Sequence, residues 1–323
     1  MNKTLILGLK ILRKSHTIFF GSSQNKKPES IQGVDVASFI IYNALTDDQP
    51  CMIAGFGNAE LNCLANYIGV KNPTKDYLKY IQGKIQSWWW EENSINQMQR
   101  FDGFFPAQED KLEQFCELMV QDIPAVNVLA SRLPYERLFD KELLACEKIA
   151  FDLLNPFFTK IPWTMALKGK KVLVVHPLAG TIQKQYLKRD LLFKNELLPV
   201  FELQTIQPPT NCAGNATVCK DWFEALDYIK NEIDKQEYDI CLIGGCGAYG
   251  FPLAAHVKRM GKKSVQFRGS LQLLFGIWDK KGKDLNYNSN YNYAQLINEH
   301  WVKLDDKIRS DKETAAYILS LQN

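Results

Sequence analysis

Short apolar runs alternate with amphipathic segments over residues 171–269, and few architectures accommodate that pattern. The apolar runs predict strands, and the amphipathic segments between them predict helices. Strands separated by helices in this way form right-handed β-α-β units with a parallel sheet covered on both faces. The sequence therefore predicts an α/β fold: a mostly parallel, Rossmann-like sheet flanked by helices. The predicted strands are 171–176, 200–206, 238–243 and 264–267, and the predicted helices are 184–193, 221–233 and 252–260.

The first half of the chain combines one strand-turn-helix unit with a longer helical section. A helix is predicted over 34–45, and a strand over 51–56 leads through a tight turn into a helix over 59–70. We therefore expect an N-terminal arm over residues 1–33, an α/β domain over 34–280 and a C-terminal helical extension over 281–323. The section from about 75 to 160 is predicted to be mostly helical, with helices at 81–90, 110–120 and 141–154 and one short strand at 126–129.

Composition excludes several classes of function. Lys and Arg number 39 and Asp and Glu number 36, so the formal charge of +3 gives no field strong enough to attract nucleic acid. The eight cysteines form no CxxC pair and no Cys/His cluster, which indicates a reducing compartment and no structural zinc. No stretch reaches the roughly 18 apolar residues that a membrane-spanning helix needs. We expect a cytoplasmic protein that binds no nucleic acid.

The N-terminal segment MNKTLILGLKILRKSHTIFF mixes leucines with basic residues. We expect it to be an amphipathic or extended arm that covers a sheet edge. The alternative is a segment that contacts a membrane surface, which would place the protein at the inner face of the membrane.

Function in a parallel sheet is expected in the crevice at the carboxyl ends of the strands. Four turns of this sequence directly follow predicted strands and form the candidate site. They are Gly57 to Glu60, His176 to Thr181, Gly244 to Gly250, and Arg268 to Ser270.

The third of these turns contains a GxGxxG pattern, formed by Gly245, Gly247 and Gly250 between a strand and a helix. Glycines there let backbone N–H groups approach a phosphate, or they only allow tight packing of the strand against the helix. A dinucleotide-binding turn also needs an acidic residue about 20 positions later for the ribose, and Arg268 stands near that place instead. The turn therefore favours a diphosphate ligand over a simple NAD enzyme.

Polar residues in the first two turns offer catalytic or metal-binding chemistry. Asn58 and Glu60 lie two positions apart at a strand-to-helix junction, where their oxygens can face a hard cation or a sugar hydroxyl. The other interpretation is that Asn58 caps the helix and Glu60 favours its dipole. His176 is either a base at a strand end or a structural hydrogen-bonding residue. The tryptophan run at 88–90 is either a sugar-stacking surface or aromatic packing under a helix.

Four segments together carry a resemblance to a known family. They are CMIAGFGNAEL, FDGFFPAQEDKLEQF, ALKGKKVLVVHPLAGTIQKQY and CLIGGCGAYGFPLAAHVKRMGKKSVQFRGSLQLLFGIW. They look like the GT-D-fold glycosyltransferases and their relatives in bacterial surface-polysaccharide clusters, and the resemblance spans about residues 35–280. In that family an Asp-x-Glu motif binds a divalent metal and the donor diphosphate, and the matching positions here are Asn58 and Glu60. The amide removes one negative charge, so the resemblance implies a weakly bound Mn²⁺ or Mg²⁺.

The resemblance implies a glycosyltransferase that moves a sugar from a nucleotide-diphosphate donor onto a bacterial surface glycan or a lipid-linked acceptor. Glu60 and His176 are then the expected catalytic residues, with Asn58 and Glu60 as the metal ligands. Lys184 and Arg268 are candidate partners of the phosphates. The expected donor-binding residues are Gly57, Asn58, Gly245, Gly247, Tyr249, Gly250 and Arg268.

Two other functions stay open at this point. An NADP-dependent oxidoreductase could use Arg268 to bind the 2′-phosphate of its cofactor. A non-catalytic glycan-assembly protein could have kept the fold after losing the acidic pair. If the protein binds metal tightly despite Asn58, the next carboxylates to consider are Asp102, Glu109 and Asp110.

Overall fold

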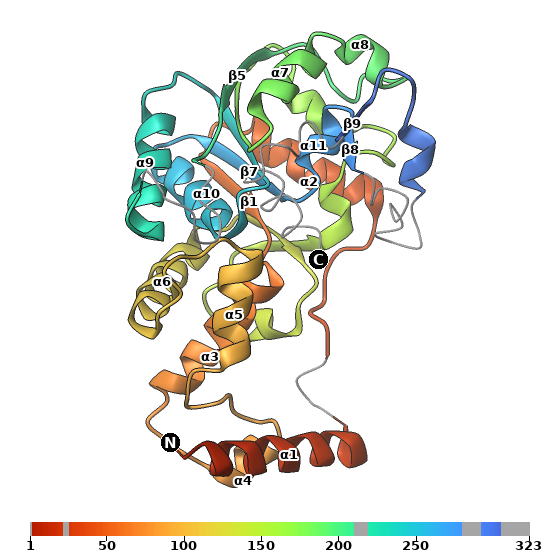
Figure 1. The fold of residues 1–323 in the computed structure, drawn as a ribbon. Helices are drawn as coiled ribbons and strands as arrows, with labels where there is room; N and C mark the ends of the chain where they lie inside the picture. The colour runs from red at the N-terminus through yellow and green to blue at the C-terminus, as the bar shows by residue number, and fades with distance from the viewer. Residues whose placement is uncertain (1, 22–25, 210–218, 280–291, 305–323) are drawn as a thin grey trace.

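The computed structural model describes residues 2–21, 26–209, 219–279 and 292–304. Its centre is a seven-stranded sheet in which neighbouring strands are all parallel (Figure 1). This confirms the predicted α/β fold with a parallel, Rossmann-like sheet. In spatial order the strands are β3 (Glu147–Ala150), β2 (Val128–Ser131), β1 (Cys51–Ala54), β7 (Lys263–Arg268), β6 (Ile240–Gly244), β4 (Lys171–Val175) and β5 (Glu202–Ile206).

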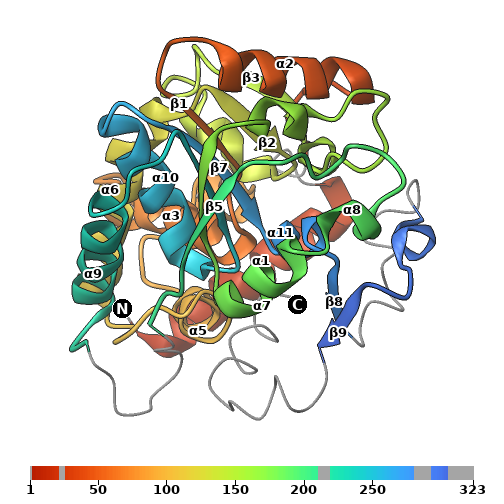
Figure 2. The same cartoon turned by 90° about the horizontal axis from the view of Figure 1, so that it is seen from above.

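Alternating side chains along the strands build one hydrophobic core on each face of the sheet. In β1, Met52 and Ala54 belong to one core, and Cys51 and Ile53 belong to the other. The first face is covered by α3 (Asn58–Lys71), α6 (Glu109–Asp122), α9 (Trp222–Asp234) and α10 (Gly250–Arg259). The second is covered by α2 (Val34–Thr46), α7 (Ala179–Tyr186), α8 (Arg189–Leu192) and α11 (Leu271–Leu274). Figure 2 shows α9 and α10 on one side of the strands and α7 and α8 on the other.

The order of the strands creates a switch point between β4 and β6. After β4 the chain continues to β5 at one edge of the sheet, whereas after β6 it continues to β7 in the opposite direction. The loops that leave these two neighbouring strands therefore diverge at the carboxyl end of the sheet. In open parallel sheets this is where a ligand crevice forms.

The predicted helix over 141–154 is wrong. Residues Glu147–Ala150 form β3, which pairs in parallel with β2, and a 3-10 helix over Phe151–Leu154 follows. The apolar spacing of this run suits a helix, but the edge of β2 offers backbone hydrogen bonds that only a strand can use. Tertiary pairing therefore overrides the local pattern.

Other helices and strands predicted in the helical section and after β4 have different boundaries in the described structure or are absent from it. The predicted helix over 81–90 is a turn, in which Gly83 has a φ of 71°. The predicted strand over 126–129 lies two residues later as β2, and the predicted helix over 184–193 is divided into α7 and α8. Two helices of this section were not expected from the sequence, namely α4 (Tyr77–Ile81) and α5 (Glu92–Phe101).

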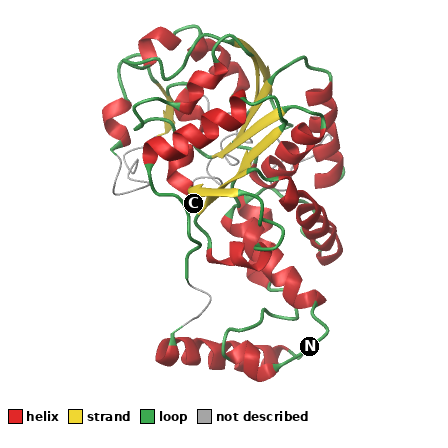
Figure 3. Cartoon of the chain, turned by 180° about the vertical axis from the view of Figure 1, so that it is seen from behind, coloured by secondary structure: helices red, strands yellow, loops and turns green. Residues whose placement is uncertain are grey.

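The N-terminal arm contains α1 (Lys3–Phe20), which packs against α4 rather than along a sheet edge. Ile31 of the arm contacts the edge strand β3 through an isolated parallel bridge to Ile149. Figure 1 and Figure 3 place α1 at the end of the molecule, with α3 and α5 between it and the sheet. No helix among the described residues has the length and apolar content needed to cross a membrane.

The C-terminal segment differs from the expected helical extension where it is described. A 3-10 helix covers Tyr293–Leu296, and β9 (Val302–Leu304) pairs in parallel with β8 (Ile277–Asp279). The rest of the predicted extension lies outside the described residues.

Candidate functional site

The four predicted turns follow four adjacent strands, β1, β7, β6 and β4, and contacts join the turns or the residues that flank them. Phe56 after β1 stacks on Phe251 of α10, with ring centroids 5.0 Å apart. Gln266 of β7 accepts a hydrogen bond from the Gly55 N–H through Oε1 at 3.1 Å. A Cβ atom on Gly245 would lie 2.9 Å from Nε2 of His176. The sheet therefore brings the predicted turns together at the carboxyl ends of its strands.

The glycine turn between β6 and α10 has a backbone that side chains would strain. Gly245 and Gly247 have φ values of 65° and 50°, in the left-handed region. A Cβ atom on Gly247 would lie 2.6 Å from the carbonyl oxygen of Asp102. Close packing against the Asp102 backbone therefore explains Gly247 without a ligand, and a bulky residue there would disturb the fold rather than only block an anion.

Several N–H groups of this turn are already used inside the protein. Those of Ala248 and Tyr249 donate to the carbonyls of Asp102 (3.0 Å) and Cys246 (3.1 Å). The N–H of Gly250 donates to the carbonyl of Gly247. An anion at this turn would therefore be held by the earlier part of the turn, before the 3-10 helix Gly247–Tyr249 is complete.

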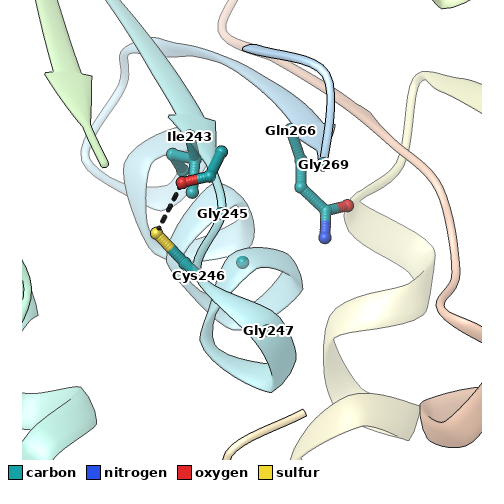
Figure 4. Close-up of a pocket in the computed structure, with 8 residues that line it drawn as sticks. Ile243, Gly245, Cys246, Gly247, Gln266 and Gly269 are labelled. Carbon is teal, nitrogen blue, oxygen red and sulfur yellow. Dashed lines mark hydrogen bonds between the residues drawn. The ribbon is translucent and has the colours of Figure 1, made fainter. Parts of the chain in front are cut away.

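A small cavity of about 30 Å³ lies against the turn (Figure 4). Gln266 faces it from β7, and because Oε1 accepts from Gly55, the amide N–H₂ group is left on the cavity side. The space suits about two water molecules or the oxygens of one small anionic group. Most of a larger ligand would lie beyond it. The lining residues are Ile243, Gly244, Gly245, Cys246, Gly247, Gly250, Gln266 and Gly269.

His176 lies beside the turn as a neutral ring. It is 2% exposed, and its Nδ1 accepts a hydrogen bond from the Leu178 N–H at 3.0 Å, so the proton of the neutral ring is on Nε2. Burial lowers the pKa of His176 to about 3, and the nearby Gln272 side chain offsets only part of this effect. Nε2 is buried and has no hydrogen-bond partner of normal geometry among the residues that the structure describes. His176 is therefore suited to donate a hydrogen bond rather than to act as the expected base.

Asn58 and Glu60 do not form the expected ligand pair. Glu60 is fully buried, and its Oε2 accepts a hydrogen bond from the Gly57 N–H at 2.7 Å, which caps the start of α3. Asn58 is exposed and makes no capping hydrogen bond, because Gly57 is the N-cap residue. These two side chains point to different environments and do not fit a shared metal ion. Among the described residues, no group of three or more His, Cys, Asp or Glu side chains is arranged to hold a metal.

The other residues that were predicted to contact the donor do not all lie at the glycine turn. Tyr249 is buried in the core, where its ring stacks on Trp222 with centroids 5.0 Å apart. Lys184 is exposed in the last turn of α7, away from the helix start that follows β4. The backbone of Arg268 pairs with Gly244 at the ends of β7 and β6, beside the glycine turn.

The tryptophan run at 88–90 supports the packing interpretation rather than a sugar-stacking surface. Trp88 is buried against Tyr80 of α4 and Leu9 of α1, and Trp89 packs on Tyr80 at 5.1 Å. Trp88 and Trp89 belong to a small apolar cluster beneath α1, whereas Trp90 packs against the core on the α3 side of the sheet.

Searches against protein-family models, curated proteins and solved structures find no match to this chain. The site is therefore interpreted from its own geometry. It offers uncharged hydrogen-bond donors at the switch point of a parallel sheet, an arrangement that suits an anionic group. Gln266 was missed in the sequence, although a polar residue between the apolar Val265 and Phe267 of the predicted strand was the available signal.

Proposed function

We propose that the protein is a glycosyltransferase that takes its sugar from a nucleotide-diphosphate donor and works on a surface glycan or a lipid-linked acceptor in the cytoplasm. The observation that carries the proposal is the glycine turn at the β4/β6 switch point, with Gln266 and its amide donor beside the cavity. The resemblance of residues 35–280 to GT-D-fold glycosyltransferases supports the choice of reaction.

In this reaction an acceptor hydroxyl oxygen bonds to the anomeric carbon of the sugar, and the bond from that carbon to the diphosphate breaks. The nucleoside diphosphate leaves as an anion, and the hydroxyl proton passes to it or to water. The chain's contribution would be to stabilise the departing phosphate oxygens with N–H groups of the turn and with the Gln266 amide. Both donors are in place before the ligand arrives, because the backbone and the Gly55–Gln266 hydrogen bond fix them. We assign no metal ligands, since Asn58 and Glu60 do not converge.

A charge-introducing variant tests the site. Gln266→Glu keeps an oxygen that accepts from the Gly55 N–H but places a carboxylate oxygen where the amide donor was. We expect the affinity for UDP or GDP, measured by calorimetry, to fall by about tenfold or more, since a hydrogen bond to an anion is replaced by repulsion. Gln183→Glu is the matched control, because Gln183 is exposed on α7, and it should bind like the wild type.

The proposal fails if the wild-type protein binds no nucleoside diphosphate. It also fails if Gln266→Glu, melting cooperatively, binds UDP and GDP as tightly as the wild type does. Release of free sugar from a bound nucleotide sugar then distinguishes a transferase from a non-catalytic binding protein.

One observation favours a second candidate, an NADP-dependent oxidoreductase. Arg268 ends the strand that follows the glycine turn and α10 in a β-α-β unit, and this is where dinucleotide-binding proteins recognise the ribose. Titration with NADPH and NADH separates the two functions. Strong preference for NADPH, with no binding of nucleoside diphosphates, would replace the glycosyltransferase proposal.

A further inference from the structure

Helix α1 presents an apolar face to solvent. Its exposed apolar side chains form two rows along the helix, separated by a strip that contains Thr4, Gly8 and Ser15. Ile18 is 71% exposed and Phe19 is 80% exposed, and soluble domains seldom expose several such large apolar side chains on one helix. The first row is Leu5, Leu12 and Phe19, and the second is Leu7, Ile11 and Ile18.

The opposite face of α1 packs against the rest of the described protein, which we call the body. Leu9 is buried against Tyr80 and Trp88. Arg13 donates a hydrogen bond to the Ile85 carbonyl at 3.2 Å, and its guanidinium lies 4.6 Å from the centre of the Tyr80 ring. These contacts set the rotation of the helix, so the open apolar rows are the outward face of a helix that is already packed.

Basic residues border the outward face. Lys3, Lys10 and Lys14 fall on one side of the row that contains Leu7, and Lys10 also forms an ion pair with Glu91 of the body. The helix contains no Asp or Glu. A partner that binds this face must therefore be apolar where it meets the leucines and isoleucines, and negatively charged where it meets the lysines. A bilayer with acidic headgroups has these properties, since it takes up apolar side chains at the headgroup boundary and attracts Lys and Arg.

We infer that the outward face of α1 docks the protein on an anionic phospholipid surface, with the helix lying in the plane of the interface. The neighbouring helix α4 also exposes two large side chains, Tyr77 and Leu78. The inference goes beyond the proposed function and does not depend on it, because it rests on α1 and α4 rather than on the glycine turn.

Sedimentation with vesicles tests this docking. The full chain is mixed with vesicles of phosphatidylcholine alone, or of phosphatidylcholine and phosphatidylglycerol in equal parts, without nucleotide. The wild type should bind the anionic vesicles, and Ile11→Ser/Ile18→Ser should weaken that binding by about tenfold or more, because two buried side chains are lost from the interface. Lys3→Gln/Lys14→Gln should weaken binding by about fivefold or more and reduce the preference for phosphatidylglycerol.

Leu144→Ser/Ile161→Ser is the matched control, since both side chains are highly exposed but lie on the body of the protein. It should bind vesicles like the wild type, and all variants should melt at the wild-type temperature. The inference is overturned if the wild type binds neither kind of vesicle, or if Ile11→Ser/Ile18→Ser binds as well as the wild type. It is also overturned if light scattering shows a wild-type dimer that this variant converts to monomers, because a second copy would then cover the face. Nucleotide affinity, measured separately, reports on the proposed function alone.

Discussion

The buried ring of His176 makes stability depend on pH. The unfolded chain protonates this ring near pH 6.5, whereas the folded protein keeps it neutral until about pH 3. The unfolded state therefore binds more protons in this window, and stability is lost as pH falls from about 6.5 toward 3. At pH 5.5 this one group should lower the free energy of unfolding by about 1.4 kcal/mol relative to pH 8.

His176→Asn removes the titrating ring, while its Oδ1 can still accept from the Leu178 N–H. In urea unfolding at pH 8 and pH 5.5, the variant should lose less stability on acidification than the wild type. Equal losses in both proteins would contradict the neutral buried ring. Carboxylates that titrate in this range affect both proteins alike and cancel in the comparison.

Glu60 provides a second test at the level of one residue. Its carboxylate caps α3 through the Gly57 N–H, so Glu60→Ala should lower the free energy of unfolding by about 1 to 3 kcal/mol. Glu92→Ala, at an exposed acid in the first turn of α5, should change it by less than about 0.5 kcal/mol. If thermal unfolding shows the two variants equally stable, the carboxylate of Glu60 does not serve as a cap.

The types of residue at the site were readable in the sequence, but their orientation was not. The spacing of Asn58 and Glu60 suggests a ligand pair, yet the helix that begins at Gly57 turns Glu60 inward and Asn58 outward. The role of His176 depends on burial by distant segments, such as α11 and its Gln272. Only the assembled fold determines the environment of such a group.

At the scale of elements, the connection between β6 and α10 requires glycine. Gly247→Ala would force a Cβ into the Asp102 carbonyl in a left-handed backbone conformation, so we expect a loss of about 2 kcal/mol or more in chemical denaturation. Gly180→Ala in α7 is the control, because a Cβ there meets nothing within 4 Å. That substitution should leave stability unchanged or raise it by up to about 1 kcal/mol. Similar effects at both positions would mean that the turn tolerates side chains.

Elements with strong local sequence patterns were predicted correctly. Elements whose conformation depends on pairing with a neighbouring strand were not. The strands Lys171–Val175 and Ile240–Gly244 are apolar runs bounded by turns, and each lies between two other strands of the sheet. Strand β3 is only partly buried, and its sequence carries helical spacing. Its conformation is set by β2, which lies beside it in space but is not visible in its local pattern.

At the scale of the whole molecule, α1 is joined to the rest mainly through α4 and the cluster around Leu9. Leu9→Ala should release α1 while the sheet stays folded, because neither main core includes α1. Hydrogen exchange of the α1 amides should become at least about tenfold faster, with no change in β1 or β6. Leu12→Ala, on the outward face, should leave exchange unchanged. Faster exchange throughout the sheet would show that α1 is part of the same cooperative unit.

The position of β7 determines when the protein can assemble during synthesis. Strands β1 to β3 form one half-sheet and β4 to β6 form the other, and β7 alone joins them by pairing with β1 and β6. It is also the last strand of this sheet to leave the ribosome. Until then, one edge of β1 and one edge of β6 carry unpaired backbone groups that can pair wrongly with other chains. A nascent chain ending before Lys263 therefore holds two half-sheets without the strand that pairs with both, and the cavity beside the glycine turn stays incomplete until Gln266 and Gly269 have been added.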